Sequence, residues 1–431
     1  MSDVAGRAVP FFRRLRVRDY KSVASCDVLF GPLTVLVGLN AVGKSNILDA
    51  LRFVRDALVH SPARALSARG GLDSVLRRSE LVDAPEGRDA ESSEVAESFA
   101  ICLEVGLGAA DGAATYELEI GRDPAGEYEH LVLRETCVLH RPEGDSTYTT
   151  DLGPDRRRYV QGGIPGAELG VEELLLPVVG RLSPYATLLN ALVAPRFYEL
   201  DTSVLRALDE TKARRRWLGE HGEHLGQVLG SLARDYPSFK EVLDGYMRAL
   251  IPSILGVDER LQGDYATIQS RFWMGDPVVP YWTAVASGTV GPGDPHVRLF
   301  QREQLSEGTV RAAGVLAALL QPGVLTGDIP LVAIEEPEIA IHPSRVGALF
   351  DALLEASQRT QVIATTQSSD FLDTEEFTPS ALRVVEMANG ATVIGELDSH
   401  TQRYLSKDPS QVAEMHRQGQ LRPADPEGEE R

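Results

Sequence analysis

The spacing of apolar residues changes along the chain, and each change predicts a different structural element. Leu33 to Val37 form a short apolar run rich in β-branched side chains, which is typical of a buried strand. Beyond it, "NILDALRFVRDAL" carries apolar residues at helical spacing from Ile47 to Leu58. Upstream, "RRLRVRDYKSVASCDVLF" predicts one more strand, which a turn at Gly31-Pro32 joins to the first. The pattern therefore predicts strand, turn, strand, loop and helix in that order.

Later segments repeat these patterns in longer blocks. Alternating apolar residues in "SFAICLEVGL", "ATYELEIG" and "EHLVLRETCVLHR" predict antiparallel strands. Residues 171–255 have a helical pattern and predict an inserted helical lobe. The last third returns to mixed structure, with strands predicted at Leu331 to Ile334 and Gln361 to Thr365 and a helix beginning near Ser344.

Two polar stretches suggest where the chain divides. The acidic segment from Ser79 to Ser98 has little to bury and predicts an exposed loop. The stretch from Pro142 to Gly170 is rich in Gly, Pro and charge, which marks a boundary. We therefore expect an N-terminal lobe with an antiparallel β subdomain at 1–140, a mainly helical insertion at 141–290, a C-terminal lobe at 291–400 and a partly disordered tail at 401–431.

Composition narrows the class of protein. The 431 residues carry a formal net charge of −20, which disfavours a protein that coats DNA by overall charge. Arginines still cluster at 13–18, 156–158 and 214–216, either as parts of a local basic groove or as solvated side chains. The three cysteines have no motif spacing, as is typical of buried thiols in a reducing compartment. Without a signal-peptide pattern or a membrane-spanning run, the sequence predicts a cytoplasmic protein that does not cross a membrane.

The loop between the first buried strand and its helix carries the clearest chemistry. "GLNAVGKS" fits G-x-x-x-x-G-K-[ST], with Gly38, Gly43, Lys44 and Ser45 at the defining positions. Glycines let backbone N–H groups turn inward on phosphates, and Lys44 reaches the β- and γ-phosphate oxygens. The Ser45 hydroxyl is a candidate Mg²⁺ ligand, so we expect ATP and Mg²⁺ as cofactors.

A second candidate group follows the later strand, in "LVAIEEPEIAIHP". Glu335 is the candidate for holding Mg²⁺ through water, and Glu336 is the candidate general base that polarises the attacking water. Two adjacent carboxylates near a core repel each other unless a cation or hydrogen bonds offset the repulsion. Taken alone, the pair is also compatible with a solvated strand end.

Four motifs in order carry a family resemblance. "GLNAVGKSN", "LSEGT", "IEEPEIAIHP" and "ATTQSSDFL" resemble those of ABC-type ATPases of the RecF/SMC-like class, including predicted ATPases labelled AAA-like. The resemblance implies a P-loop NTPase of α/β class, an ABC ATPase head with a mostly parallel sheet, an antiparallel β subdomain and an inserted helical lobe. It also places Asn40 and Asn46 among the nucleotide-binding residues.

The resemblance gives "LSEGT" a role as the ABC signature. In such ATPases the signature of one subunit touches the γ-phosphate held by the other, which implies an ATP-dependent homodimer with two composite sites. Ser306 supplies a hydroxyl, Gly308 permits close backbone approach, and the following helix directs its dipole at an anion. The alternative is that Ser306 is an N-cap that serves only its own helix.

Several positions depart from the family pattern or match it weakly. Gln367 stands where the family commonly has a switch histidine; its amide donates a hydrogen bond but carries no proton, so we expect slow hydrolysis. Gln161 is a weak candidate for the Mg²⁺-sensing loop glutamine. Residues 20–22 are a weak candidate adenine contact, and Glu338 and His342 are candidates to face the partner subunit.

Two smaller groups favour structural explanations. His221 and His224 are spaced like a metal pair, but no third ligand is in view, which favours a polar helix start. Trp217 beside three arginines can stack on a base, yet a core tryptophan flanked by exposed arginines is commoner.

These observations support two main hypotheses for function. The first is a dimerising ATPase that acts in DNA repair or in defence against foreign DNA. The second is an ATP-sensing subunit that controls a separately encoded effector protein. The nucleotide-binding subunit of a membrane transporter shares the site chemistry, but the large insertion argues against it.

Overall fold

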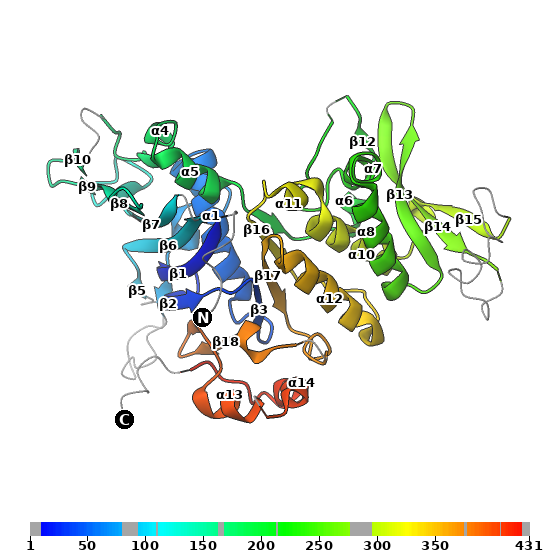
Figure 1. The fold of residues 1–431 in the computed structure, drawn as a ribbon. Helices are drawn as coiled ribbons and strands as arrows, with labels where there is room; N and C mark the ends of the chain where they lie inside the picture. The colour runs from blue at the N-terminus through cyan, green and yellow to red at the C-terminus, as the bar shows by residue number, and fades with distance from the viewer. Residues whose placement is uncertain are drawn as a thin grey trace. The chain divides into compact units, whose positions relative to one another are not determined.

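The computed structural model describes residues 10–79, 94–108, 111–162, 168–212, 214–275, 295–374, 377–405 and 407–424. The chain divides into two compact units, Met1–Pro195 with Thr378–Arg431 and Arg196–Phe377 (Figure 1). These boundaries differ from the predicted ones, because the first unit takes in both ends of the chain. Most of the predicted acidic loop, at 80–93, and the chain end at 425–431 lie outside the described residues.

The first unit contains a seven-stranded antiparallel sheet in the order β10-β9-β8-β7-β6-β1-β2. On β1, buried Leu15 and Val17 alternate with arginines, so that one face of the sheet packs on the core. This sheet is the predicted antiparallel subdomain, extended by two strands that the sequence had placed in the insertion. The strands are β1 (Phe11–Tyr20), β2 (Val23–Leu29), β6 (Ser98–Gly108), β7 (Gly112–Gly121), β8 (Leu131–His140), β9 (Ser146–Leu152) and β10 (Arg158–Gly162), with β4 (Arg78–Ser79) and β5 (Glu94–Val95) pairing separately.

The arginine cluster on β1 is compensated by acidic side chains of the same sheet. The ion pairs join Arg14 to Asp27, Arg16 to Glu104 and Arg18 to Glu119. Because three of the four arginines have a carboxylate beside them, most of the positive charge that the sequence left open as a basic groove is neutralised.

The rest of the first unit surrounds β3 (Leu33–Val37), whose five residues are all buried. β3 pairs in parallel with β18 (Leu382–Ala388), which pairs antiparallel with β19 (Ala391–Gly395). The helix α1 (Lys44–Val59) packs its apolar face against α2 (Pro62–Ser67) and α5 (Tyr185–Val193). The remaining helices are α3 (Leu72–Val75), α4 (Leu176–Val179), α13 (Ser399–Leu405) and α14 (Val412–Arg417).

The second unit has a parallel sheet in which β16 (Leu331–Glu335) lies between β11 (Arg196–Tyr198) and β17 (Gln361–Thr366). Against it pack α10 (Glu307–Leu320) and α12 (Val346–Ser357), and α11 (Pro322–Thr326) follows α10. In the described part of the chain, the span Glu307–Thr326 is long and apolar enough to cross a membrane, but 89% of its most apolar window is buried. An apolar helix that is buried to this extent is typical of a protein core.

The segment predicted as a helical lobe is only partly helical. The helices are α6 (Thr202–Leu205), α7 (Leu225–Asp235) and α8 (Pro237–Leu250), and the strands are β12 (Asp209–Glu210), β13 (Ile254–Gln262), β14 (Tyr265–Trp273) and β15 (Val297–Gln301). β14 pairs with the other three strands. The prediction of a mainly helical insertion therefore does not describe the residues from Ile254 to Trp273, which form β13 and β14 and pair across a sheet.

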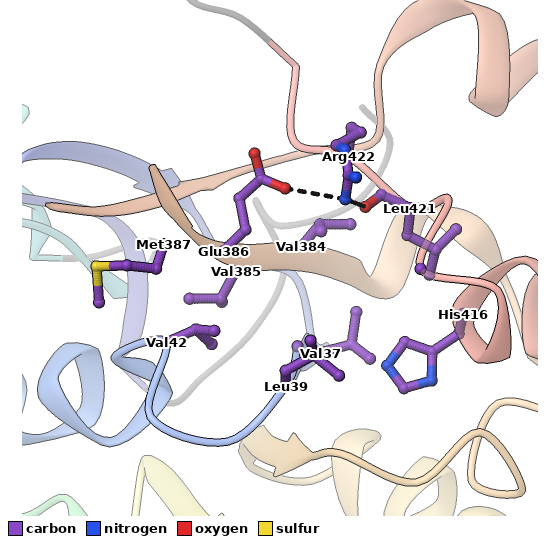
Figure 2. A pocket seen from close by; sticks show the side chains of 12 residues that line it. Val37, Leu39, Val42, Val384, Val385, Glu386, Met387, His416, Leu421 and Arg422 are labelled. Atoms are coloured by element: carbon purple, nitrogen blue, oxygen red, sulfur yellow. Dashed lines mark hydrogen bonds and ion pairs between the residues drawn. The ribbon is translucent and has the colours of Figure 1, made fainter. Parts of the chain in front are cut away.

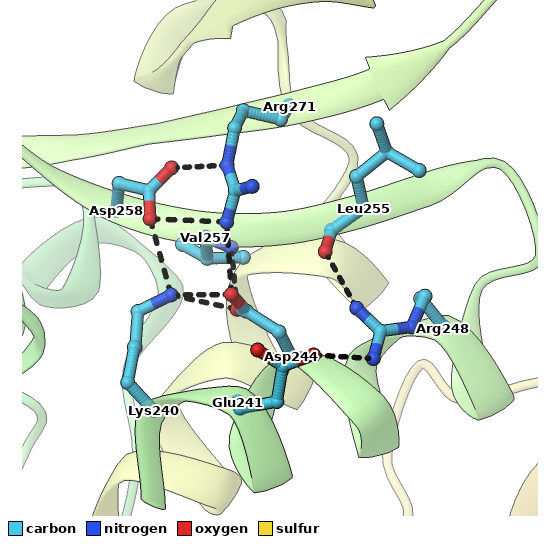
Figure 3. A network of polar contacts seen from close by, with 8 residues as sticks. All are labelled: Lys240, Glu241, Asp244, Arg248, Leu255, Val257, Asp258 and Arg271. Atoms are coloured by element: carbon cyan, nitrogen blue, oxygen red, sulfur yellow. Dashed lines mark hydrogen bonds and ion pairs between the residues drawn. The ribbon is translucent and has the colours of Figure 1, made fainter. Parts of the chain in front are cut away.

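A buried ionic network fastens α8 to this hairpin (Figure 3). The Lys240 ammonium lies 2.7 Å from Asp244 and 3.1 Å from Asp258, and the Arg271 guanidinium lies 2.8 Å and 2.7 Å from the same two carboxylates. Two cations against two anions leave no uncompensated charge, which is the condition under which buried charges are tolerated.

Candidate functional site

The phosphate loop joins β3 to α1 in the first unit, and its two glycines are required by their surroundings. Gly43 has φ of 100°, and a Cβ there would lie 2.0 Å from Thr392 Oγ1. A Cβ on Gly38 would lie 2.1 Å from Val385 O. A larger residue at Gly43 would displace the Thr392 side chain of β19, and one at Gly38 would displace the backbone of β18. The loop therefore keeps its shape only with glycine at both positions.

Lys44 lies inside this loop. Its side chain is buried, and Nζ donates to Gly38 O and Leu39 O, each at 2.8 Å. The ammonium therefore lies at the N-terminus of α1 among backbone groups. This position suits an anionic ligand, which would take the place of the two carbonyls as hydrogen-bond acceptor. Ser45 and Asn40 are exposed at the loop surface.

Residues far apart in the sequence brace the outer side of the loop. Asn46 Nδ2 donates to Ser22 Oγ at 2.6 Å, Ser22 Oγ lies 2.6 Å from Thr392 Oγ1, and Thr392 Oγ1 donates to Val42 O at 2.8 Å. The structure thus places Asn46 and Ser22 beside the loop. One of the two N–H groups of the Asn46 side-chain amide is used in the hydrogen bond to Ser22.

Tyr20 does not serve as an adenine contact, contrary to that interpretation of residues 20–22. Its ring is fully buried between Phe53 and Phe99, and its hydroxyl donates to Asp49 Oδ2 at 2.7 Å. Asp49 also accepts from Lys21 at 2.6 Å and from Arg69 at 2.9 Å. This cluster fixes α1, and so the phosphate loop that precedes it, to the turn between β1 and β2.

Replacing Asp49 with Asn should lower the free energy of unfolding by about 2 kcal/mol at pH 7. Burial alone raises the pKa of Asp49, but hydrogen bonds and charges from Arg69 and Lys21 hold that pKa below its ordinary value. A depressed carboxyl pKa contributes stability above the unfolded pKa, about 3.9, and loses it as the pH falls through the folded pKa. Denaturant unfolding at several pH values should show the loss shrinking in acid. Asp264→Asn, at an exposed carboxylate, is the control, and an equal loss at every pH would contradict the assignment.

The C-terminal segment, predicted only as a tail, borders the phosphate loop. A cavity of about 410 Å³ lies between the start of the loop, β18 and the residues after α14 (Figure 2). His416 of α14 points into it toward Val37 and Leu39, and Arg422 pairs with Glu386 at 3.2 Å on its rim. Burial, and then the charge of Lys44, lower the pKa of His416, so the imidazole is neutral beside the loop.

In the second unit the structure brings Glu336 and Gln367 together. Glu335 ends β16 opposite Thr365 of β17, and Glu336 follows with φ of 44°, a left-handed conformation uncommon for a residue with a side chain. The Glu336 N–H donates to Thr365 O at 3.1 Å, and Gln367 Nε2 donates to Glu336 Oε2 at 3.1 Å. The direction of the Glu336 carboxylate is therefore set by the hydrogen bond of its own backbone and by the hydrogen bond from the neutral Gln367 amide.

Of the two residues of this turn that were predicted to face a partner subunit, one is buried and the other is exposed. Glu338 is buried and accepts a hydrogen bond from Thr366 Oγ1, so its carboxylate serves the fold and does not face outward. His342 is exposed, and its Nδ1 caps the turn beginning at Pro343 by accepting from Ser344 N at 3.3 Å.

The signature residues begin α10. Ser306 is exposed and is the N-cap, because its Oγ accepts from Thr309 N at 3.2 Å. Contacts within the same chain already require glycine at position 308, because a Cβ there would lie 2.3 Å from Ala340 O of the turn after β16. The N-cap interpretation therefore describes Ser306 in the single chain, and the glycine allows α10 to touch the Glu336 turn.

The remaining candidates lie elsewhere or have protein partners. Gln161 is on β10, the edge of the seven-stranded sheet opposite β2, so it is a poor candidate for a residue that senses Mg²⁺. His221 Nδ1 lies 3.1 Å from Glu199 O and His224 Nδ1 lies 3.1 Å from Asp209 Oδ1. Trp217 packs closely on Gly323, as a core tryptophan does.

The donor atoms fit the expected cofactors. A loop shaped by glycines around a lysine suits a polyphosphate, and the hydroxyl of Ser45 and the carboxylate of Glu335 are the oxygen ligands that Mg²⁺ prefers. The phosphate loop, the acidic strand end and the signature helix are the features of an ABC-type ATPase head of the RecF/SMC class. The chain belongs to the family described as "AAA domain, putative AbiEii toxin, Type IV TA system", whose model matches residues 33–124 and 196–373.

Individual relatives agree with this class. The DNA replication and repair protein RecF of Rhizobium etli (strain CIAT 652) is 25% identical over 379 residues, covering 79% of this chain and 88% of the relative. The SMC head bound to the C-winged helix domain of ScpA has a TM-score of 0.51 at 13% identity, covering 91% of this chain and 99% of that one. An SMC head with an extended coiled coil, bound to the C-terminal domain of ScpA derived from Pyrococcus furiosus, has a TM-score of 0.51 at 12% identity, covering 93% and 99%. These similarities confirm the predicted fold class.

Proposed function

We propose that this chain binds ATP with Mg²⁺, hydrolyses it slowly, and pairs head-to-tail with a second copy of itself while ATP is bound. The phosphate loop supports this proposal most directly, because it combines two sterically required glycines with a buried Lys44, a combination suited to polyphosphate. Gly38, Asn40, Gly43 and Asn46 would be further nucleotide-binding residues. Bound Mg²⁺ would neutralise charge on the phosphates.

The residues of the second unit would supply metal binding and proton transfer. Ser45 of the loop and Glu335 would hold the metal, and Glu336 would take the proton from the attacking water. Gln367 holds the Glu336 carboxylate through a neutral amide, which can orient it but cannot relay a proton. Slow turnover follows from this arrangement.

Pairing would use Ser306 and Gly308 of one copy against the γ-phosphate held by the other. We expect Ser306→Arg to abolish ATP-driven dimerisation while leaving ATP affinity within about threefold, because the bulky cation fills the position of the serine hydroxyl. Light scattering with and without ATP measures the pairing, and calorimetry measures the affinity.

The N-cap role of Ser306 calls for a matched variant. Ser306→Asp keeps a strong N-cap but places a negative charge where the partner's phosphate would lie. Loss of pairing in this variant therefore cannot come from an uncapped helix. A Ser306→Asp chain that still dimerises with ATP would show that the serine is only a cap.

For the biological role we propose DNA maintenance or defence against foreign DNA, in the cytoplasm. The similarity to a DNA replication and repair protein over most of both chains supports this. Filter binding of duplex DNA at low salt should show binding that ATP stimulates. No binding with ATP present would reject it.

The second candidate is an ATP-sensing subunit of a two-protein system. The family description names a putative toxin of a toxin–antitoxin system, which favours a chain that works with a separately encoded partner protein. Purification of the tagged chain from its native host tests this idea. A stoichiometric second protein, released or retained by ATP, supports it, and purification of the chain alone counts against it.

A further inference from the structure

Arg311 lies on the second turn of α10 and is buried, although arginine is rarely buried without a specific partner. Its Nη1 donates to Leu200 O at 2.7 Å, and its Nη2 lies 3.4 Å from Glu336 O, a long hydrogen bond. One guanidinium thus joins α10, the chain after β11 and the turn that carries the candidate general base.

That turn holds an unfavourable backbone conformation. Glu336 has φ of 44° and Ala340 has φ of 64°. Left-handed conformations of residues with side chains persist when the surroundings fix them from several directions, and they concentrate at functional sites. At Glu336 the N–H is fixed by Thr365 O, the carbonyl accepts from Ile339 N at 3.2 Å and from Arg311, and the carboxylate is held by Gln367.

α10 also touches the other end of the same turn. Gly308 approaches Ala340 O so closely that a Cβ would lie 2.3 Å from it. Arg311 comes three residues after Gly308, so the two lie on one face of the helix. The turn from Glu336 to Ala340 is therefore supported at both ends by the first two turns of α10.

We propose that Arg311 is a positioning residue for Glu336. By holding the Glu336 carbonyl it fixes the direction in which the carboxylate leaves the backbone, and it ties that direction to the helix that begins at Ser306. The inference rests on the proposed ATPase function and names a residue to which no motif assigns a role.

The test compares Arg311→Met with Arg311→Lys. Met has similar length but no donors, and Lys keeps the charge but lacks the forked guanidinium that reaches two carbonyls at once. We expect kcat to fall about 50-fold in Arg311→Met, because a misplacement of about 1 Å at a reacting group can cost about 100-fold. Arg311→Lys should recover part of that loss. KM and the Kd for ATP should stay within about threefold, because the phosphate loop is intact.

A double variant separates positioning from general loss of structure. If Arg311 acts through Glu336, adding Arg311→Met to Glu336→Gln should lower kcat no further, since linked residues are non-additive. Arg248→Met is the matched control, because Arg248 also donates to a backbone carbonyl, Leu255 O at 3.1 Å (Figure 3), while its ion pair is to Glu241 of its own helix. Its kcat should match that of the wild type.

Each outcome decides one claim. Wild-type kcat in Arg311→Met, or a further loss in the double variant, would overturn the positioning role. If Arg311→Met does not fold, Arg311→Lys alone should still have a lower kcat than the wild type at unchanged Kd, and a wild-type kcat would overturn the proposal. A wild-type chain that binds but never turns over ATP would instead reject the proposed ATPase function.

Discussion

Lys44→Ala should weaken ATP binding by about 100-fold or more, which corresponds to about 2.7 kcal/mol. The buried ammonium donates to the neutral loop carbonyls of Gly38 and Leu39. A bound phosphate would replace them with a negatively charged acceptor, which makes a stronger hydrogen bond to the positively charged lysine. Without the ammonium, the loop "GLNAVGKS" offers the phosphates no positively charged side chain. Titration calorimetry with ATP in the presence of Mg²⁺ gives the affinity directly.

The control for this variant is Lys407→Ala, at an exposed lysine of the C-terminal segment. It removes the same charge from the chain without touching the loop, so its affinity should equal that of the wild type. Binding by Lys44→Ala within threefold of the wild type would mean that the loop does not hold phosphate through this lysine.

Glu336→Gln should lower kcat for ATP hydrolysis by about 100- to 1000-fold, because an amide cannot accept the proton of the attacking water. The local geometry should survive, since the new amide oxygen can still accept from Gln367 Nε2. With ATP bound and not consumed, the paired state should accumulate, since a ligand that binds one state shifts the population toward it. Light scattering should therefore detect a stable dimer only with ATP.

Glu241→Gln is the matched control for this change. Glu241 is highly exposed on α8, and its ion pair within the described residues is a long contact to Arg248 at 3.8 Å, so its loss should leave both turnover and pairing unchanged. A Glu336→Gln chain that stays monomeric with saturating ATP would contradict the head-to-tail pairing, whatever its rate of hydrolysis.

Local patterns predicted the parts of the site that depend on neighbouring residues. The phosphate loop follows from a β-branched strand, two glycines and an amphipathic helix, all within 27 residues from Leu33 to Val59. Glu335 and Glu336 follow in the same way from an apolar strand that ends in two carboxylates. In both places the sequence pattern and the hydrogen-bonded structure are set by the same short segment.

Contacts between distant segments could not be predicted in this way. Gly308 looked like a requirement of the partner's phosphate, but its closest constraint is Ala340 of its own chain, 32 positions away. Tyr20 looked available to a base, but burial against Phe53 and Phe99 removes it. Arg311 showed no signal except a charge within an apolar helix, which in retrospect marks a position where the chain must supply a polar partner.

Ser306 can serve both as a helix cap and as a contact to a second subunit, because its hydroxyl can accept and donate hydrogen bonds at the same time. A lone pair of Oγ accepts the Thr309 N–H and satisfies the start of α10, and this use consumes no proton. The hydroxyl of Thr309, 2.8 Å away, can donate to a second lone pair, which leaves the Ser306 proton for an acceptor outside the chain. The same hydroxyl can therefore cap the start of its own helix and donate to a neighbouring phosphate without exchanging one hydrogen bond for the other.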